Sequence, residues 1–388
     1  MNESPKENNV RLAMPYLPLS VIDRIGELIK SGFLTEGKIA REFELAVAKY
    51  CDVEYTCVVP NATIGLELAL RAMIPMFNDR DEVVVPGFTH PATILSIINA
   101  GLKAVVVDID RQTMLIDMNS MQDVIGKNTA AIMPVSLFGN PIDYANLYAA
   151  IDLSSKHTIY TIEDAACSIG SKATHEMKPV GSEADVTVFS FHPRKIITTG
   201  EGGMILTNNE YILEAVEKMK NFGLDVSGGI VAQRCGSNYR MSDIQATIGL
   251  AQMEILDDII ERRRDIAISY DNMIDNDLSE TDIQRQIFTK DSYSNFQTYC
   301  VDVGFGRNFI LDFMRSKGVE AQIASYAVAE NPEFWKLKNF NVSSCYMSGI
   351  IAKRTMALPL YVGMKEADIS AVIQTFKEAI NLNQERGY

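Results

Sequence analysis

Short apolar runs alternate with segments of helical periodicity between residues 55 and 207. The apolar runs are rich in β-branched residues and predict buried strands at residues 55–59, 82–86, 104–108, 130–136, 158–162, 186–190 and 203–207. Helical patterns lie between most of them, at about residues 63–73, 91–100, 118–125 and 144–151. This order predicts an α/β fold with a mostly parallel sheet covered by helices on both faces. Ligands of such folds bind beyond the carboxyl ends of the strands.

The segments on either side of this core predict two further parts of the chain. Before it, helical patterns at residues 20–31 and 38–50 form an N-terminal segment, with Gly32 as a C-cap. After it, Ser242 is the expected N-cap of one long helix over residues 243–274. The remainder predicts a smaller α+β domain, with strands at 296–303 and 319–323 and helices at 307–317 and 365–382. We therefore expect an N-terminal segment and large domain in residues 1–255, and a small C-terminal domain in residues 256–388.

The charge of the chain excludes two classes of partner. The 388 residues carry a formal net charge of −14, and the isoelectric point is near 4.9. A nucleic acid or an anionic membrane surface would therefore be repelled at long range. Any phosphate group that the protein binds must be held by a local arrangement of donors.

The cysteines and the N-terminus favour a cytoplasmic location. Six cysteines are scattered without metal-ligand spacing, at Cys51, Cys57, Cys167, Cys235, Cys300 and Cys345. With only four histidines beside them, they indicate free thiols in a reducing compartment and no metal site. The first residues, MNESPKENN, lack the apolar core of a signal peptide or anchor, and no uncharged apolar stretch reaches membrane-spanning length.

One lysine lies on a glycine turn directly after the strand at residues 186–190. Residues 184–209 read ADVTVFSFHPRKIITTGEGGMILTNN, which places Lys195 ahead of Gly200, Gly202 and Gly203. Glycines allow positive φ angles and let the backbone approach a bulky group closely. A lysine on such a turn can lose part of its hydration, which frees the amine for Schiff-base chemistry. An ordinary lysine on a surface hairpin is the alternative that this motif leaves open.

Three more residues are expected near Lys195, because they stand at strand ends or at a helix start. Asp164 follows a strand in IEDAACS, and a carboxylate buried there needs a cation; a simple helix cap is the alternative. Thr63 opens the helix of PNATIGLELAL, where free N–H groups and the helix dipole suit a phosphate, although a plain cap is common. Ser190 offers a hydroxyl to the same phosphate, unless it pairs with the backbone.

Eight stretches carry a resemblance to a known family: GFLTEGKIAREFE, NATIGLELAL, PGFTHPATILSIINAG, PVSLFGNPID, IEDAACSIGS, SFHPRKIITTGEGGMI, GSNYRMSDIQATIGLAQME and ALPLYVGM. In this order and spacing, they make nearly the whole chain resemble the nucleotide-sugar aminotransferases of the DegT/StrS family. These are fold-type-I enzymes that use pyridoxal 5′-phosphate (PLP). The combination of stretches is specific and favours the functional alternative for each motif above.

The resemblance implies a role for each matching residue. Lys195 matches the lysine that carries PLP covalently and later moves a proton, and Asp164 matches the carboxylate that pairs with the pyridine nitrogen. Thr63 and Ile64 match the pair that holds the phosphate through backbone and hydroxyl, with Ser190 beside them. Asn238, in GSNYRMSD, matches a residue that reaches this phosphate from the partner subunit. The resemblance thus implies a homodimer with shared active sites.

Two positions depart from the family pattern. His90 stands where an aromatic ring usually stacks on the cofactor, and an imidazole can stack but can also carry charge or move a proton. Cys167 stands where Gln, His or Glu is usual, and a thiol is a weak hydrogen-bond partner for the cofactor's 3′-oxygen. In the family's dehydratase branch a histidine replaces the catalytic lysine. Here Lys195 is present and His192 precedes it, so transamination is favoured.

The function expected from the resemblance is a ping-pong transfer of an amino group. An amino acid, by resemblance L-glutamate, donates the amine, and a keto sugar linked to a nucleotide accepts it. Family members that aminate C4 tend to carry GEGG after the lysine, and this chain has GEGG at residues 200–203, so a 4-keto-6-deoxy sugar is favoured. The alternatives are transamination of a free keto sugar or cyclitol, another PLP reaction, and a catalytically silent regulatory member.

A NAD-dependent sugar enzyme was a further candidate and is disfavoured by spacing. No G-x-G-x-x-G motif follows a predicted strand, and GFGRNF at residues 304–309 lacks the third glycine. The sequence therefore favours PLP chemistry over nicotinamide chemistry.

Overall fold

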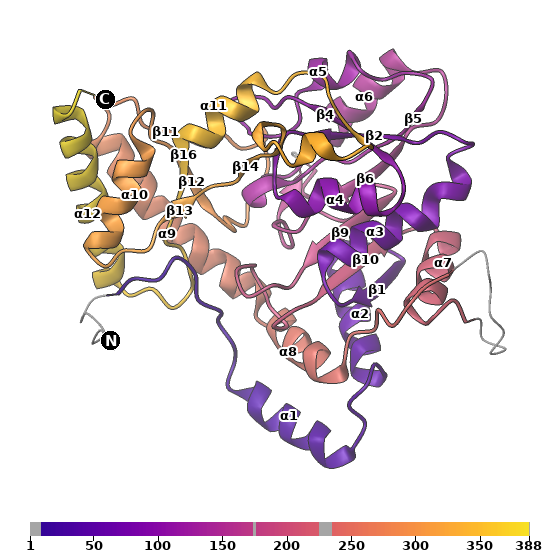
Figure 1. Ribbon diagram of the computed structural model, residues 1–388. Helices are drawn as coiled ribbons and strands as arrows, with labels where there is room; N and C mark the ends of the chain where they lie inside the picture. Colours follow the sequence, from indigo (N-terminus) through magenta and orange to yellow (C-terminus); the bar gives the residue numbers. More distant parts are fainter. Residues whose placement is uncertain (1–8, 174–175, 225–234, 388) are drawn as a thin grey trace.

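The computed structural model describes residues 9–173, 176–224 and 235–387, and an eight-stranded sheet forms its centre (Figure 1). The strands, in spatial order, are β1 (Tyr55–Val59), β10 (Gly203–Thr207), β9 (Val186–Ser190), β6 (Tyr160–Asp164), β5 (Thr129–Ile132), β2 (Glu82–Pro86), β4 (Lys103–Val107) and β15 (Phe340–Val342). Strand β10 runs antiparallel to β1 and β9. Every other neighbouring pair in this described sheet is parallel, which confirms the predicted sheet type.

Helices cover both faces of the sheet, because alternate residues of each strand are apolar on opposite sides. One face packs against α3 (Ala62–Met73), α4 (Pro91–Asn99) and α7 (Glu210–Lys220). The other face packs against α2 (Lys38–Cys51), α5 (Met118–Gln122) and α6 (Tyr144–Ser154). In β1, for example, Cys57 and Val59 belong to the first core, and Val58 belongs to the second.

Four of the seven predicted strands have the predicted bounds: β1, β2, β9 and β10. The strand expected at residues 130–136 is the shorter β5, because Pro134 has no N–H group to continue the ladder. The strand expected at residues 158–162 is shifted and ends at Asp164, so this carboxylate closes β6 itself.

The single long helix predicted over residues 243–274 is wrong. The chain forms α8 (Asp243–Met253) and then α9 (Leu256–Asp277), with Ile255 between them at a non-helical φ of −125°. The predicted N-cap is confirmed, since the Ser242 hydroxyl accepts a hydrogen bond from the Gln245 N–H group. The break lets α8 pack on α2 in the large core while α9 enters the second core.

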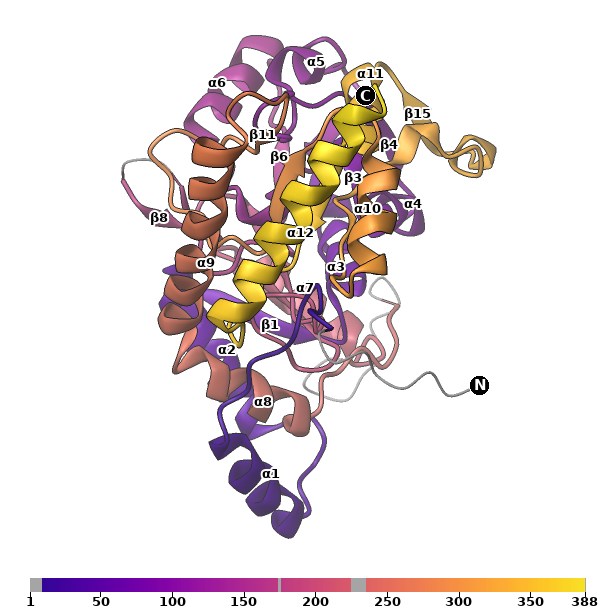
Figure 2. The ribbon, with the colours of Figure 1, turned by 90° about the vertical axis from the view of Figure 1, so that its left-hand side faces the viewer.

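A four-stranded antiparallel sheet forms this second body. Its strands, in order, are β11 (Gln284–Arg285), β12 (Tyr299–Asp302), β16 (Thr355–Leu358) and β13 (Gln322–Ile323). Helices α9, α10 (Arg307–Ser316) and α12 (Glu366–Glu385) pack beside one another over the sheet (Figure 2). The strand expected from residue 296 starts three residues later, because Phe296 has a positive φ of 47° that no strand accommodates. The strand expected from residue 319 is cut short too, since Val319 pairs with Val10 instead.

Residues after β13 return to the large sheet, which no sequence pattern indicated. Strand β14 (Tyr326–Ala327) pairs with β3 (Phe88–Thr89), and β15 then extends the large sheet beside β4. The following helix α11 (Tyr346–Arg354) begins against Asp108, whose carboxylate accepts from the N–H groups of Met347 and Ser348, both at 2.7 Å. The division of the chain between residues 255 and 256 remains a proposal. Strand β15 follows this boundary in the sequence but belongs to the large sheet.

The N-terminal helix α1 (Ser20–Ser31) projects from the large domain, where it contacts α8 (Figure 1). It ends at the predicted C-cap, Gly32, which has a φ of 75°. Large apolar side chains along it face solvent: Leu19 is 82% exposed, Ile22 is 68% exposed and Phe33 is 79% exposed. None of the helices in the described ranges has the length and apolar run that a bilayer span requires.

Candidate active site

Asp164 ends β6 as a buried carboxylate, with 6% of its surface exposed. Its Oδ2 atom accepts a hydrogen bond of 2.7 Å from the Thr93 hydroxyl on α4, and its Oδ1 atom accepts one of 3.1 Å from the Ala166 N–H group. Thr93 in turn shares a 2.9 Å hydrogen bond with the Thr89 hydroxyl. No lysine or arginine within the described residues forms an ion pair with Asp164. A buried carboxylate with only neutral donors is suited to a cationic group of a ligand.

Lys195 lies on the turn that follows β9, and its amine points at the end of β6. The Lys195 N–H group donates to the His192 carbonyl at 2.8 Å, which fixes the turn. The Nζ atom donates a 3.1 Å hydrogen bond to the Sγ atom of Cys167. In the described structure the amine forms no ion pair with a carboxylate, so it is oriented without being neutralised.

His90 caps the start of α4 and lies within electrostatic reach of the same groups. Its Nδ1 atom accepts a 3.2 Å hydrogen bond from the Ala92 N–H group, and its ring meets the Tyr326 ring edge-on at 5.9 Å. Partial burial and then the Lys195 ammonium lower the pKa of His90, while the Asp164 carboxylate opposes them. His90 is therefore a neutral imidazole at neutral pH.

The start of α3 lies against the end of β9, which brings two predicted phosphate ligands together. Gly203 pairs with Ser190 in the sheet, and a Cβ atom at Gly203 would lie 2.8 Å from the Ala62 backbone nitrogen. Only glycine allows this approach. The Asn61 side chain caps α3 by accepting from the Ile64 N–H group at 2.9 Å. The N–H group of Ile64, a predicted phosphate ligand, is therefore already engaged by Asn61, and the N–H groups of Ala62 and Thr63 are the ones that remain for an anion.

The structure brings most of the predicted site residues together. Asp164, Lys195, Cys167 and His90 form one cluster. Ser190 and Thr63 stand at adjoining element ends. Within the protomer, Asn238 lies instead on an exposed loop, where it pairs with Asn221.

Sequence reasoning missed three residues that bear on the site. Thr93 orients Asp164, and Ala62 offers an N–H group at the start of α3. Tyr326 contacts His90 from the small-domain side of the chain. The spacing of Thr89 and Thr93, four residues apart beside a helix start, was a signal that could have identified Thr93. For Tyr326 the sequence held no signal.

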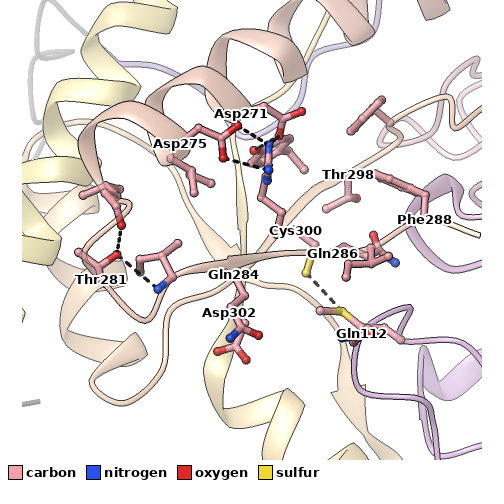
Figure 3. A pocket seen from close by; sticks show the side chains of 18 of the residues that line it. Gln112, Asp271, Asp275, Thr281, Gln284, Gln286, Phe288, Thr298, Cys300 and Asp302 are labelled. Atoms are coloured by element: carbon pink, nitrogen blue, oxygen red, sulfur yellow. Dashed lines mark hydrogen bonds and ion pairs between the residues drawn. The ribbon is translucent and has the colours of Figure 1, made fainter.

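A cavity of about 680 Å³ lies between α9 and β11, and the predicted site residues do not line it (Figure 3). Arg285 bridges Asp271 at 3.3 Å and Asp275 at 2.9 Å on its wall, and the Tyr299 hydroxyl donates to Asp271 at 2.6 Å. Gln286 donates from its amide nitrogen to the Thr113 carbonyl at 2.9 Å. This cavity belongs to the small sheet and is separate from the Lys195 cluster.

Comparison with known proteins identifies the family of the chain. A model of the DegT/DnrJ/EryC1/StrS aminotransferase family matches residues 19–377. The chain belongs to this family. A GDP-perosamine synthase from Caulobacter vibrioides is 31% identical over 385 residues, covering 98% of this chain and 100% of that relative. Another, from Vibrio cholerae, is 29% identical and covers 92% of this chain and 95% of its own length.

Solved structures of similar proteins share the fold. One is a putative sugar aminotransferase, Spr1654 from Streptococcus pneumoniae, in its PMP form. It is 25% identical with a TM-score of 0.87, and the match covers 97% of this chain and 100% of that one. PseC from Helicobacter pylori, an aminotransferase involved in the biosynthesis of pseudoaminic acid, has a TM-score of 0.86 at 21% identity, covering 96% and 100%. The fold class expected of a DegT/StrS member is thereby confirmed.

Proposed function

We propose that this member of the aminotransferase family uses PLP to move an amino group from an amino acid, L-glutamate, to a keto sugar linked to a nucleotide. The observation that carries the proposal is a cluster that holds both the Lys195 amine and the buried Asp164 carboxylate, neither of which has an ion-pair partner among the described residues. PLP bound there would supply an electron sink for the reacting carbon. The nucleotide-sugar substrate is supported by the two GDP-perosamine synthases that match nearly the whole chain.

Each side chain of the cluster has one task in this chemistry. Asp164 would hold the pyridine nitrogen of bound PLP, and an opposite charge at contact would raise the pKa of that nitrogen by roughly 1–3 units. Thr93 holds the carboxylate in place for that contact. Lys195 binds the cofactor through Nζ and, when released, carries the proton between the cofactor and the substrate carbon. His90 would line the ring of bound PLP, and its lowered pKa favours the neutral form, which adds no positive charge beside Lys195.

The phosphate is held by local donors, as the net charge of the chain requires. The N–H groups of Ala62 and Thr63 and the positive end of the α3 dipole face it, and the hydroxyls of Thr63 and Ser190 add to them. Asn238 supplies a further contact from the partner subunit. Its exposed position on a loop outside the protomer's own cluster supports that role.

The active unit in this proposal is a homodimer. Helix α1 exposes Ile22 and Ile29, the flanking residues Leu19 and Phe33 are exposed too, and an apolar surface of this kind is stabilised when a second copy covers it. The compartment is the cytoplasm, in keeping with cysteines that form no disulfide in the described structure.

The position of the new amine is C4 of a 4-keto-6-deoxy sugar. The support is the GEGG loop. Burial lowers the pKa of His192 beside this loop, and the Glu201 carboxylate partly opposes that shift. One methylene in the loop carboxylate is worth about 1–3 kcal/mol in discrimination between sugars. A change of Glu201 to Asp should therefore alter the preference between keto positions without abolishing activity.

The test is incubation of the enzyme, PLP and glutamate with 3-keto and 4-keto sugar nucleotides in separate reactions, followed by NMR location of the new C–N bond. Amination at C4 supports the proposal. Amination at C3 alone contradicts the regiochemistry, and amination of only a free keto sugar or cyclitol contradicts the nucleotide-linked substrate. No amination of any ketone by protein that binds PLP would favour a regulatory member.

A further inference from the structure

A thiol and an amine lie in direct contact at the centre of the site. The Nζ atom of Lys195 is 3.1 Å from the Sγ atom of Cys167. Backbone contacts fix both residues: the Lys195 N–H group is bonded within its turn, and the buried Asn295 side chain donates to the Cys167 carbonyl at 3.0 Å. The fold therefore holds the two backbones at a separation that lets the thiol and the amine meet.

Cys167 differs from four other thiols of this chain in combining partial exposure with a lysine amine as its neighbour. Burial raises the pKa of Cys57 and of Cys345 to about 12, and it raises the pKa of Cys51 and Cys300 further, so these four are held as unreactive thiols. Cys167 is only partly buried and has a cation as its neighbour. Reactive cysteines in proteins share these two traits, partial exposure and an adjacent positive group.

We propose that Cys167 and Lys195 form an oxidant-dependent covalent cross-link between sulfur and nitrogen, a sulfenamide. A peroxide first oxidises the Cys167 thiol to a sulfenic acid and is itself reduced to water. The deprotonated Lys195 amine then attacks the sulfur, the S–O bond breaks, and the oxygen leaves as a second water after taking up the proton from nitrogen. The product has an S–N bond and two hydrogen atoms fewer than the starting pair. Excess thiol reverses the reaction by attacking sulfur and releasing the amine.

The cross-link would act as a reversible block on the amine. Its effect on activity rests on the proposed function, because a lysine bound to sulfur cannot bind PLP. The chemistry itself requires only the contact between the two side chains. Cofactor bound to Lys195 should conversely protect the pair, since the amine is then engaged. The protein would thus be sensitive to oxidant whenever Lys195 is released.

The test uses the full-length protein in a Cys235→Ser background, which removes an exposed thiol outside the cluster. Protein freed of cofactor is treated with hydrogen peroxide, digested without reductant and analysed by mass spectrometry. We expect one linked peptide pair that contains residues 167 and 195, lighter by two hydrogen atoms, and its loss after treatment with dithiothreitol. Prior incubation with PLP should lower the yield at least several-fold.

Two variants separate the cross-link from simple oxidation. Cys167→Ser should give no linked pair, and a thermal melt compared with the parent protein checks that it is folded. Lys195→Arg keeps a cation but removes the amine nucleophile, so Cys167 should remain as a sulfenic acid that dimedone captures. Dimedone capture at Cys167 in the parent protein without any link to Lys195 would overturn the inference, as would the absence of oxidation at Cys167.

The two proposals fail in different ways. If the linked pair forms but PLP never gives a visible absorbance band with the untreated protein, the proposed function fails and the cross-link stands. If PLP binds at Lys195 but peroxide yields no linked pair from cofactor-free protein, the cross-link fails and the proposed function stands.

Discussion

The Thr93 hydroxyl donates a hydrogen bond of 2.7 Å to the Asp164 carboxylate across 71 residues of sequence. Thr93 belongs to the first turn of α4, and Asp164 closes β6, so a helix start and a strand end fix one carboxylate between them. A carboxylate held in this way cannot rotate to find other partners. Its position for a cationic ligand group is set before any ligand arrives.

Replacing Lys195 with alanine should abolish both colour and turnover. The purified protein should be yellow, with a visible absorbance band that borohydride removes, because PLP is attached at this amine. The exposed Lys127 provides a matched control, and Lys127→Ala should keep the band and the activity. A borohydride-reducible adduct at another lysine of Lys195→Ala would show that the attachment site is elsewhere.

Replacing Asp164 with asparagine should leave the fold intact and lower turnover by roughly 10- to 1,000-fold. The size follows from losing a contact charge that shifts a partner's pKa by about 1–3 units, each worth a factor of ten. Steady-state kinetics and circular dichroism measure the two effects separately. The exposed Asp152→Asn serves as a control with no expected change. Near-normal turnover of Asp164→Asn would return this residue to the role of a helix cap.

Mixing two inactive variants should restore activity if Asn238 acts across the subunit interface. In a heterodimer of Lys195→Ala and Asn238→Ala protomers, one site then carries both lesions and the other carries none. Random exchange at equal concentrations should restore about a quarter of the wild-type activity, since half of the dimers have one intact site. No recovery after verified subunit exchange would place Asn238 in its own protomer's site or outside both, and fully active monomers in sedimentation would exclude the shared site.

Glu163 should make the protein less stable as the pH rises from about 4.5 to about 7. Burial raises its pKa from 4.5 to about 7, although the Ser136 and Thr187 hydroxyls donate to it and oppose the shift. The folded state therefore binds the proton more tightly than the unfolded state between these two pH values. The stability that the protonated side chain contributes is lost in full above about pH 7. Glu163→Gln should remove the dependence and raise the unfolding free energy at about pH 8 by about 3 kcal/mol.

Urea unfolding at several pH values measures this effect. The exposed Glu280→Gln is a suitable control, because a solvated carboxylate should leave the pH profile unchanged. A pH profile of Glu163→Gln that parallels the parent's between about pH 5 and pH 8 would contradict the assignment.

The sequence predicted the parts of the fold that depend on local pattern. Strands β1, β2, β9 and β10 were found at their bounds because each is a compact apolar run closed by polar or turn residues. The ends of β6 and β9 carry Asp164 and Lys195, and since these strands are parallel neighbours, residues that follow them meet in space. The motif positions therefore predicted the cluster, although the contact between Lys195 and Cys167 required coordinates.

The features that the sequence did not predict depend on tertiary packing. No glycine or proline marks the break between α8 and α9. The start of α9 still packs in the large core through Leu256 and Ile260, and its later residues, from Ile266 onward, pack in the second core. Strand β15 has only three residues and an exposed Asn341 at its centre, so neither its length nor its periodicity distinguishes it from a loop. The contact between Tyr326 and His90 arises from the same returning segment.

That returning segment determines whether the small domain can be treated as a module. A fragment starting at residue 256 would carry β14 and β15 without the strands that complete them, and it would lack Val10, which pairs with Val319. The unpaired strands of this fragment would present backbone edges and apolar surface to solvent, and both features promote aggregation. Residues 256–388 expressed alone should therefore be insoluble, whereas the full chain supplies β3, β4 and Val10 and preserves every pairing. The chain is divided into two bodies in space but is not divisible into two pieces in sequence.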